Sequence, residues 1–241
     1  MSDRFNGATV GEMVAADYRA AAVFERFDID FCCGGGRLLV DACRQAAVSP
    51  DAVEQALQSL LALDTCEGAD VAGWPIDKLA DHIVATHHEY VRSALPTITR
   101  WLSRIRAVHG ANHPELLSAS ASFERLSIEL SQHMLKEELV LFPYIRELAS
   151  TRPGHMKPSP FGTVQNPIRM MEREHQEVDD EILRMRELTN GYSLPADGCS
   201  TYRVCLAELA QFESDLRRHV HLENDVLFPK AVEAERVLLH G

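Results

Sequence analysis

Four stretches of the chain carry apolar residues at the alternating three- and four-residue spacing that marks the buried face of an α-helix. This spacing predicts long helices over residues 76–108, 114–149, 164–189 and 198–237. Weaker patterns over Val10–Phe27 and Asp51–Leu63 predict shorter helices. Pro143 and Pro229 fall late in their helices, where we expect them to kink or tighten the last turns. Because no stretch has the two-residue period of a strand, we expect an all-α protein built around a four-helix bundle.

The second and fourth long helices repeat each other at an offset of 86 residues. In each apolar stripe a histidine and a glutamate four residues apart occupy positions that should be apolar: His133 and Glu137, then His219 and Glu223. That spacing puts both side chains on one face of a helix, one turn apart. A buried carboxylate without a partner costs several kcal/mol or more. The repeat therefore predicts a cation between the helices.

The first and third long helices each add one histidine to the apolar stripe, His88 and His175, at an offset of 87 residues. Two hairpins folded on each other would collect four imidazoles and two carboxylates, more ligands than one zinc ion usually takes. The set suits two divalent ions, each held by two histidines and joined by both carboxylates. An added oxide or hydroxide bridge would leave one open position on each ion. The histidine-rich set favours iron, and zinc and manganese remain alternatives.

Charge and composition exclude several classes of function. The net charge is −12 over 241 residues, which argues against nucleic acid as a partner because phosphate binding needs a basic surface. No apolar run approaches the ~20 residues of a membrane span, and the first residues lack the plan of a secretory signal. Six cysteines at irregular spacing fit thiols in a reducing compartment. We expect a cytoplasmic protein that makes no use of a membrane.

A segment rich in glycine, acid and proline, residues 64–75, predicts a linker. It divides the chain into a small helical domain, residues 1–63, and the bundle domain, residues 76–237. The small domain contains Cys32 and Cys33, followed by three glycines. Adjacent cysteines bond to each other only with strain, and the glycines leave their backbone accessible. We expect a functional thiol pair here, and the alternative is a helix-ending turn with one buried thiol.

Three acidic residues are candidates for the surroundings of the ions. Glu129 and Asp215 each precede a hairpin histidine by four residues, where they could orient an imidazole or relay protons. Glu174 and Glu138 neighbour ligands in the sequence but are expected to point elsewhere, with Glu174 a candidate for lining an access route. The other histidines miss the apolar stripes or lie in loops and are predicted to be solvated: His82, His87, His109, His113, His155, His221 and His240.

Taken together, these residues resemble the repair-of-iron-centres proteins, which are hemerythrin-like di-iron proteins of bacteria tied to nitric oxide stress. The resemblance covers almost the whole chain. Gly36 is one departure, since many members have a polar residue there. The motifs on which the resemblance rests are the lone His88, His133-x3-Glu137-Glu138 with Leu141-Phe142-Pro143, Met171-Glu172-x-Glu174-His175, His219-x3-Glu223-Asn224 with Leu227-Phe228-Pro229, and Asp28-Ile-Asp30-Phe31-Cys32-Cys33-Gly34-Gly35-Gly36.

The resemblance implies a hemerythrin-like four-helix bundle that holds two non-haem iron ions. Its terminal ligands would be His88, His133, His175 and His219, and its bridging ligands Glu137 and Glu223. Members bind nitric oxide at the reduced centre, have been linked to its reduction to nitrous oxide, and help to restore damaged iron–sulfur clusters. Cys32 and Cys33 would be redox- or nitrosylation-sensitive thiols.

Two classes of function stay open at this point. The chain is either an enzyme that reduces nitric oxide, or a binding protein that sequesters nitric oxide or donates iron to damaged iron–sulfur proteins. Both use the same ligands, so the sequence does not separate them. A sensor of dioxygen or redox state ranks last, because it would normally need a fused output domain.

Overall fold

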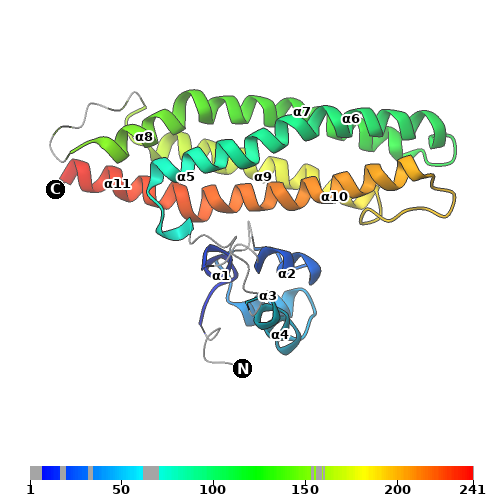
Figure 1. Cartoon of the computed structure of the whole chain (residues 1–241), viewed down its shortest axis with the longest axis horizontal. Coiled ribbons are helices and arrows are strands. Elements are labelled where there is room, and N and C mark those ends of the chain that lie inside the picture. The colour runs from blue at the N-terminus through cyan, green and yellow to red at the C-terminus, as the bar shows by residue number, and fades with distance from the viewer. Residues whose placement is uncertain are drawn as a thin grey trace.

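The computed structural model describes residues 7–16, 20–31, 35–61, 71–152, 155, 159 and 161–240. Helices form nearly all of the regular structure in these ranges. One isolated bridge, between Thr9 and Leu38, is the only strand-like pairing found among them. Figure 1 shows long helices that lie lengthwise against one another, with a group of short helices below their middle. The predicted all-α fold is confirmed.

The bundle consists of two helical hairpins in series (Figure 1). Within it, α6 packs against α7 and α10, and α7 packs against α9. The first hairpin runs through α5 (Ile76–Ile83), the π-helical turn η2 (Val84–His88) and α6 (Glu89–His109), and returns through α7 (Glu115–Lys136), the π-helical turn η3 (Glu137–Leu141) and α8 (Phe142–Ser150). The second consists of α9 (Gln165–Leu188), then α10 (Ser200–His221), the π-helical turn η4 (Leu222–Leu227) and α11 (Phe228–His240).

Two of the π-helical turns, η3 and η4, end shortly before a proline, Pro143 in α8 and Pro229 in α11. A proline has no N–H to donate to the carbonyl four residues back, and its ring crowds that carbonyl. An extra residue in the preceding turn relieves both problems. The turn before each proline is π-helical and therefore wider than an α-helical turn, so of the two expected effects, a kink or a tightening, the tightening is absent there. π-helical turns within α-helices are frequent at functional sites.

The core of the bundle has two apolar parts at different levels along its length. One part includes Phe123 and Phe212, whose ring centroids lie 5.5 Å apart with an angle of 66° between the planes. The other includes Phe142 and Phe228. All four phenylalanines are fully buried. Between the two parts lies a layer of buried histidine and glutamate side chains, so the apolar core is interrupted where the repeated motifs predict polar residues.

The N-terminal residues have an apolar core of their own, which includes Phe24 and Phe31. Four short helices contribute to it: α1 (Val10–Ala16), α2 (Ala20–Arg26), α3 (Leu39–Gln45) and α4 (Pro50–Leu61). A capping box starts α1: the Thr9 amide donates to Glu12 Oε2 at 2.8 Å, and the Glu12 amide donates to Thr9 Oγ1 at 3.1 Å. These two bonds satisfy amides that the first turn leaves free.

The N-terminal helices contact the bundle at the level of the interrupted core. α1 packs against η4 and against the short 3₁₀-helix η1 (Val71–Gly73), and α2 packs against α10. Arg186 of α9 donates to Asp28 Oδ1 at 2.7 Å across this junction. The two glycines nearby differ: a Cβ added to Gly35 would lie 2.7 Å from the carbonyl oxygen of Phe31, whereas Gly36 faces open space. A larger residue at position 36 would therefore fit without a clash.

Cys32 and Cys33 lie outside the described residues, so their role remains a prediction. The same holds for most of the predicted linker, since the structure resumes its description at residue 71.

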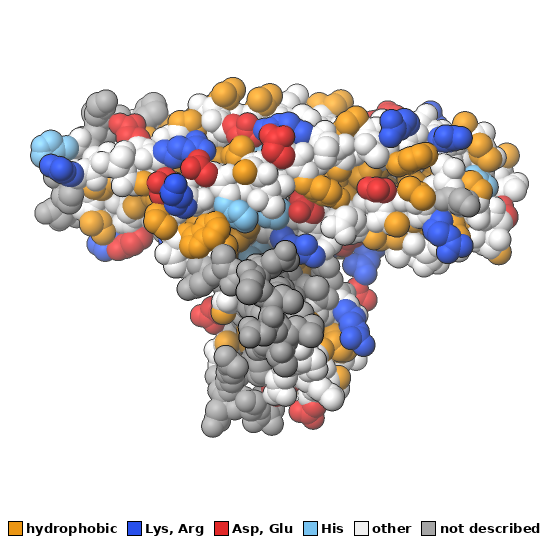
Figure 2. Space-filling model, in the orientation of Figure 1, with side chains coloured by type: hydrophobic (Ala, Val, Ile, Leu, Met, Phe, Trp, Pro, Cys, Tyr) orange, Lys and Arg blue, Asp and Glu red, His pale blue; other side chains and the backbone are white. Residues whose placement is uncertain are grey.

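The surface of the bundle carries both signs of charge. In the view of Figure 2, basic and acidic side chains are interspersed along the bundle, without a continuous basic face on that side. No helix among the described residues is long and apolar enough to cross a membrane.

Replacing Phe123 by Ala tests the apolar part of the core that is distant from α8 and α11. Phe123 is fully buried, and large-to-small changes of this kind cost about 3–5 kcal/mol in the free energy of unfolding. Leu117 lies on the same helix but is 63% exposed, so Leu117→Ala should change stability by less than about 0.5 kcal/mol. Urea unfolding followed by circular dichroism measures both. Equal effects of the two variants would contradict the described packing.

Candidate metal centre

The layer that interrupts the core contains all six residues that the sequence predicts as ligands. They come from all four long helices of the bundle, and each has at most 3% of its surface exposed. They form two groups of four possible ligands, which share both glutamates. The residues are His88 in η2, His133 in α7, Glu137 in η3, His175 in α9, His219 in α10 and Glu223 in η4.

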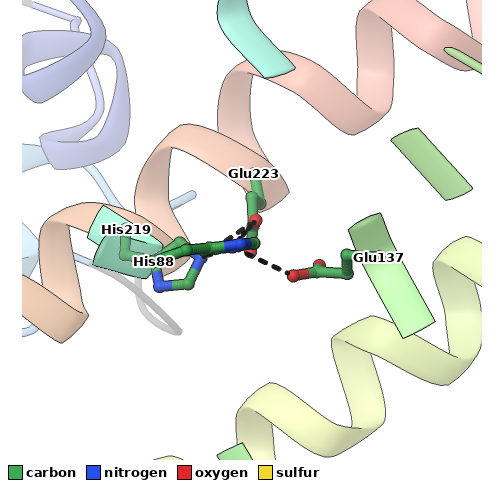
Figure 3. Close-up of side chains that lie close together, drawn as sticks. All are labelled: His88, Glu137, His219 and Glu223. Atoms are coloured by element: carbon green, nitrogen blue, oxygen red, sulfur yellow. Dashed lines mark hydrogen bonds and ion pairs between the residues drawn. The ribbon is translucent and has the colours of Figure 1, made fainter. Parts of the chain in front are cut away.

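The first group consists of His88, His219, Glu137 and Glu223 (Figure 3). The Nε2 atoms of the two histidines lie 3.2 Å apart. His219 Nε2 is 3.0 Å from Glu223 Oε1, and His88 Nε2 is 3.4 Å from Glu137 Oε2. Ligand atoms from three helices therefore converge on one point.

The second group consists of His133 and His175 with the same two glutamates. The Nε2 atoms of these histidines lie 3.0 Å apart. His175 Nε2 is 3.1 Å from Glu223 Oε2, and His133 Nε2 is 3.4 Å from Glu137 Oε2. Glu223 thus presents Oε1 to the first group and Oε2 to the second. Each carboxylate lies between the two histidine pairs, as a bridging ligand would.

The polar atoms of this layer fit a pair of cations. Neither oxygen of Glu137, nor Glu223 Oε2, has a hydrogen bond of good geometry among the described residues, although histidine Nε2 atoms lie 3.1 Å from Glu223 Oε2 and 3.4 Å from Glu137 Oε2. Both glutamates are completely buried, where an uncompensated carboxylate costs several kcal/mol. The four Nε2 atoms face one another in pairs. Imidazole nitrogens and carboxylate oxygens together are ligands that suit iron, manganese or zinc.

Protons can replace cations in this layer when it holds no metal. Burial alone lowers the pKa of His88, but hydrogen bonds and charge from Glu137 and Glu223 raise it to about 10. Burial likewise lowers the pKa of His133, but the charge of Glu137, the hydrogen bonds to Glu137 and Glu174 and the charge of Glu223 together outweigh it, so that this pKa also rises to about 10. Burial raises the pKa of Glu223, yet the charge of His219 and the hydrogen bonds from His175 and His219 bring it well below the ordinary value.

Three of the four histidines donate a hydrogen bond from Nδ1 to a carboxylate or amide oxygen on a neighbouring helix. His88 Nδ1 lies 2.6 Å from Glu138 Oε1, His133 Nδ1 lies 3.0 Å from Glu174 Oε2, and His175 Nδ1 lies 2.9 Å from Asn224 Oδ1. Such contacts set the tautomer and orientation of a metal-binding imidazole.

The expectation that Glu138 and Glu174 point elsewhere was wrong. Each points away from the histidine of its own helix but reaches the histidine of a neighbouring helix. The hydrogen bond from His133 has the largest effect on Glu174, and together with the hydrogen bond from Lys136 it lowers the pKa of Glu174 to about 2, although partial burial acts to raise it. Glu174 and Glu129 also line a cavity of about 160 Å³ beside His133.

The fourth histidine, His219, is different. Its Nδ1 is buried and has no hydrogen-bond partner among the described residues. His87 lies flat on its ring, with centroids 5.6 Å apart and planes 6° from parallel. Asp215 does not reach His219; its Oδ1 accepts from His87 Nδ1 at 3.0 Å. The prediction that His87 and His221 are solvated was wrong, since they are 6% and 1% exposed.

These buried histidines belong to the junction between the bundle and the N-terminal helices. A cavity of about 210 Å³ lies there, lined by Val14 of α1 and by His82, His87, Asp215 and His221 among others. His221 Nδ1 donates to Asp225 Oδ2 at 2.8 Å, and its ring lies against that of Phe31, with centroids 6.2 Å apart. Docking of the N-terminal helices is what buries His221, which a reading of the bundle pattern alone could not anticipate.

Comparison with known proteins agrees with this architecture. Residues 79–231 match the family profile of the hemerythrin HHE cation binding domain, and residues 6–61 match ScdA_N, a domain of unknown function (DUF542). The iron-sulfur cluster repair protein YtfE of Dickeya chrysanthemi is 30% identical over 231 residues, which cover 96% of this chain and 99% of that protein. YtfE of Cronobacter sakazakii is 31% identical over 234 residues, with the same coverage of 96% and 99%. A probable iron-sulfur cluster repair protein of Haemophilus influenzae is 30% identical over 224 residues, covering 92% and 96%.

Metal loading should release protons. His88 and His133 are protonated below pH about 10 in the metal-free protein, and a ligand must lose its proton to bind metal. At about pH 7 we expect at least about two protons released per chain, and an apparent affinity that rises with pH up to about 10. Calorimetric titration in buffers of different ionisation enthalpy counts these protons. His113→Gln, a change outside the layer, should leave the count unchanged; binding without proton release would contradict the assignment.

Proposed function

The chain belongs to the hemerythrin-like family of iron–sulfur cluster repair proteins, and we propose that it holds two iron ions and acts on damaged iron–sulfur proteins during nitric oxide stress. The observation that carries this proposal is the pair of ligand groups that share Glu137 and Glu223. A single ion would leave one histidine pair without a cation. Two ions account for every polar atom of the layer that faces its centre.

We propose His88 and His219 as the terminal ligands of one ion, and His133 and His175 as those of the other. Glu137 and Glu223 would bridge the two, together with an oxide or hydroxide. The family supports iron as the metal, since the relatives in the comparison are named for iron–sulfur cluster repair.

When bound in the ferrous state, the two ions would supply the two electrons that, with two protons, convert two molecules of nitric oxide to one of nitrous oxide and one of water. The protein would contribute orientation and exclusion of water. Glu138 and Glu174 hold the Nδ1 protons of His88 and His133, which fixes the direction of each Nε2 lone pair. Phe142 and Phe228 would help to exclude water, because their rings stack on His88 and His175 with centroids 5.7 Å and 6.1 Å apart.

We propose Cys32 and Cys33 as redox-active or nitrosylation-sensitive thiols; in the redox role the two thiols would lose two electrons and two protons and form a disulfide, which an external reductant would reopen. The position of the next described residue, Gly35, supports this proposal. A Cβ added to Gly35 would lie 3.4 Å from Asp225 Oδ2, so Gly35 is close to the bundle at η4.

Nitrous oxide formation by the reduced protein tests the proposed reaction. Ferrous protein with two ions per chain, mixed with two equivalents of nitric oxide, should give up to one nitrous oxide per chain in the headspace by gas chromatography. His133→Ala, which removes a proposed ligand of one of the two ions, should give none, and His113→Gln should behave as the parent. Stable binding of nitric oxide without nitrous oxide would contradict reduction and favour the alternative, a protein that sequesters nitric oxide.

Replacing both cysteines distinguishes the proposed role of the thiols from that of the metal ligands in the bundle. Cys32→Ser combined with Cys33→Ser should leave the iron content at two per chain, because the six proposed ligands all lie in the bundle. The same variant should lose repeated turnover with an external reductant while keeping the first turnover. Elemental analysis and gas chromatography measure the two quantities. A double variant that purifies without iron would show that the thiols belong to the metal site.

A further inference from the structure

The two halves of the metal centre are related by the internal repeat, so their outer contacts can be compared position by position. Glu138 and Asn224 are equivalent at an offset of 86 residues, and both accept from the histidine of the first helix in their hairpin. Glu174 accepts from His133. Its equivalent at an offset of 87 residues is His87, which should serve His219 in the same way. This one contact of the four is missing.

The missing contact has a visible cause in the neighbouring side chains. Lys136 donates to Glu174 Oε1 and leaves Oε2 facing His133. In the other half the position of Lys136 is held by Leu222, at an offset of 86 residues. His87 instead donates its Nδ1 to Asp215 and stacks on His219 with its ring face. A stacked ring offers no acceptor to His219 Nδ1, and that atom stays unpartnered among the described residues.

Support of this kind affects how tightly a metal is held. Loss of a partner that orients a ligand histidine typically costs 10- to 100-fold in metal affinity. Cavity size does not distinguish the halves: about 210 Å³ lies beside His87 and about 160 Å³ beside Glu174 and His133. The cavity at His87 is lined by neither His88 nor His219, so the difference between the halves rests on the missing contact and not on access. Both halves also share the same two bridging glutamates.

We infer that the ion held by His88 and His219 is the exchangeable ion of the pair, and that the ion held by His133 and His175 is the resident one. This inference rests on the proposed two-ion centre and deepens it. A protein that releases one ion and keeps the other retains a cation beside its buried carboxylates. It can therefore donate iron to a damaged cluster without losing the charge balance of its core. The same site would then be refilled.

The test is the time course of iron release from the full-length ferrous protein to an excess of a colorimetric ferrous chelator, without oxygen. We expect two phases of equal amplitude, each one ion per chain, with rates that differ about 10- to 100-fold. A single phase that releases both ions would overturn the inference.

Variants assign the phases to the two halves. Glu174→Gln weakens the support of His133 and should accelerate the slow phase while the fast phase keeps its rate. Glu177→Gln is the matched control: Glu177 lies on the same helix and lines the same cavity, but it forms an ion pair with Arg173 and not a contact with a ligand. The control should change neither phase. Acceleration of the fast phase alone by Glu174→Gln would contradict the assignment.

A variant that restores the missing hydrogen bond to His219 tests directly whether its absence makes the ion exchangeable. In His87→Gln the side-chain carbonyl can accept from His219 Nδ1 while the amide donates to Asp215, so both neighbours are satisfied. The fast phase should slow at least several-fold and the slow phase should not change. An unchanged fast phase in folded, fully loaded His87→Gln protein would overturn the account of the missing contact.

The outcomes separate this inference from the proposed function. If the fully loaded protein binds fewer than two ions per chain, the result contradicts the proposed function. If it binds two ions and releases them together, the result contradicts only the inference.

Discussion

Two completely buried carboxylates, Glu137 and Glu223, are the constraint on which the rest of this structure depends. Each sits in a helix stripe that elsewhere packs leucine, phenylalanine and methionine. Charged groups at that depth need compensation within hydrogen-bonding distance, because water cannot supply it. In the metal-free state the protonated imidazoles of His88 and His133 compensate them, and in a metal-bound state all four surrounding imidazoles would provide ligand atoms. The layer is therefore stable only when positive charge is present in one form or the other.

The same constraint explains the departures from regular helix geometry. Three of the four ligand-bearing segments include a π-helical turn at or beside a ligand: η2 ends at His88, η3 begins at Glu137 and η4 contains Glu223. A wider turn shifts the direction in which the following side chains project, so that ligands from several helices can meet at one level. By contrast, α9 carries His175 without such a turn among the described elements.

Repetition made most of the centre predictable from the sequence. The four helices, their pairing and the convergence of six side chains follow from stripes that recur at 86 and 87 residues. The contacts made across helices did not follow, because a stripe shows which face a residue occupies and not which neighbour it reaches. Glu138 and Glu174 were misjudged for this reason. The repeat nevertheless contained a usable signal, since Glu138 and Asn224 are equivalent positions and both can accept a hydrogen bond.

The spacing of apolar residues could not predict how the N-terminal helices pack against the bundle. His87 and His221 lie off the bundle stripes, yet contacts with Asp215, with Phe31 and with the N-terminal helices bury them. Such burial depends on the fit of two separate surfaces. The sequence of either part alone carries little trace of it.

The most direct measurement is anomalous X-ray scattering at the iron edge from crystals of the fully loaded protein. We expect two peaks in the bundle core, one between His88 and His219 and the other between His133 and His175, with Glu137 and Glu223 between them. A single peak, or any of these six side chains turned away from the metal, would contradict it.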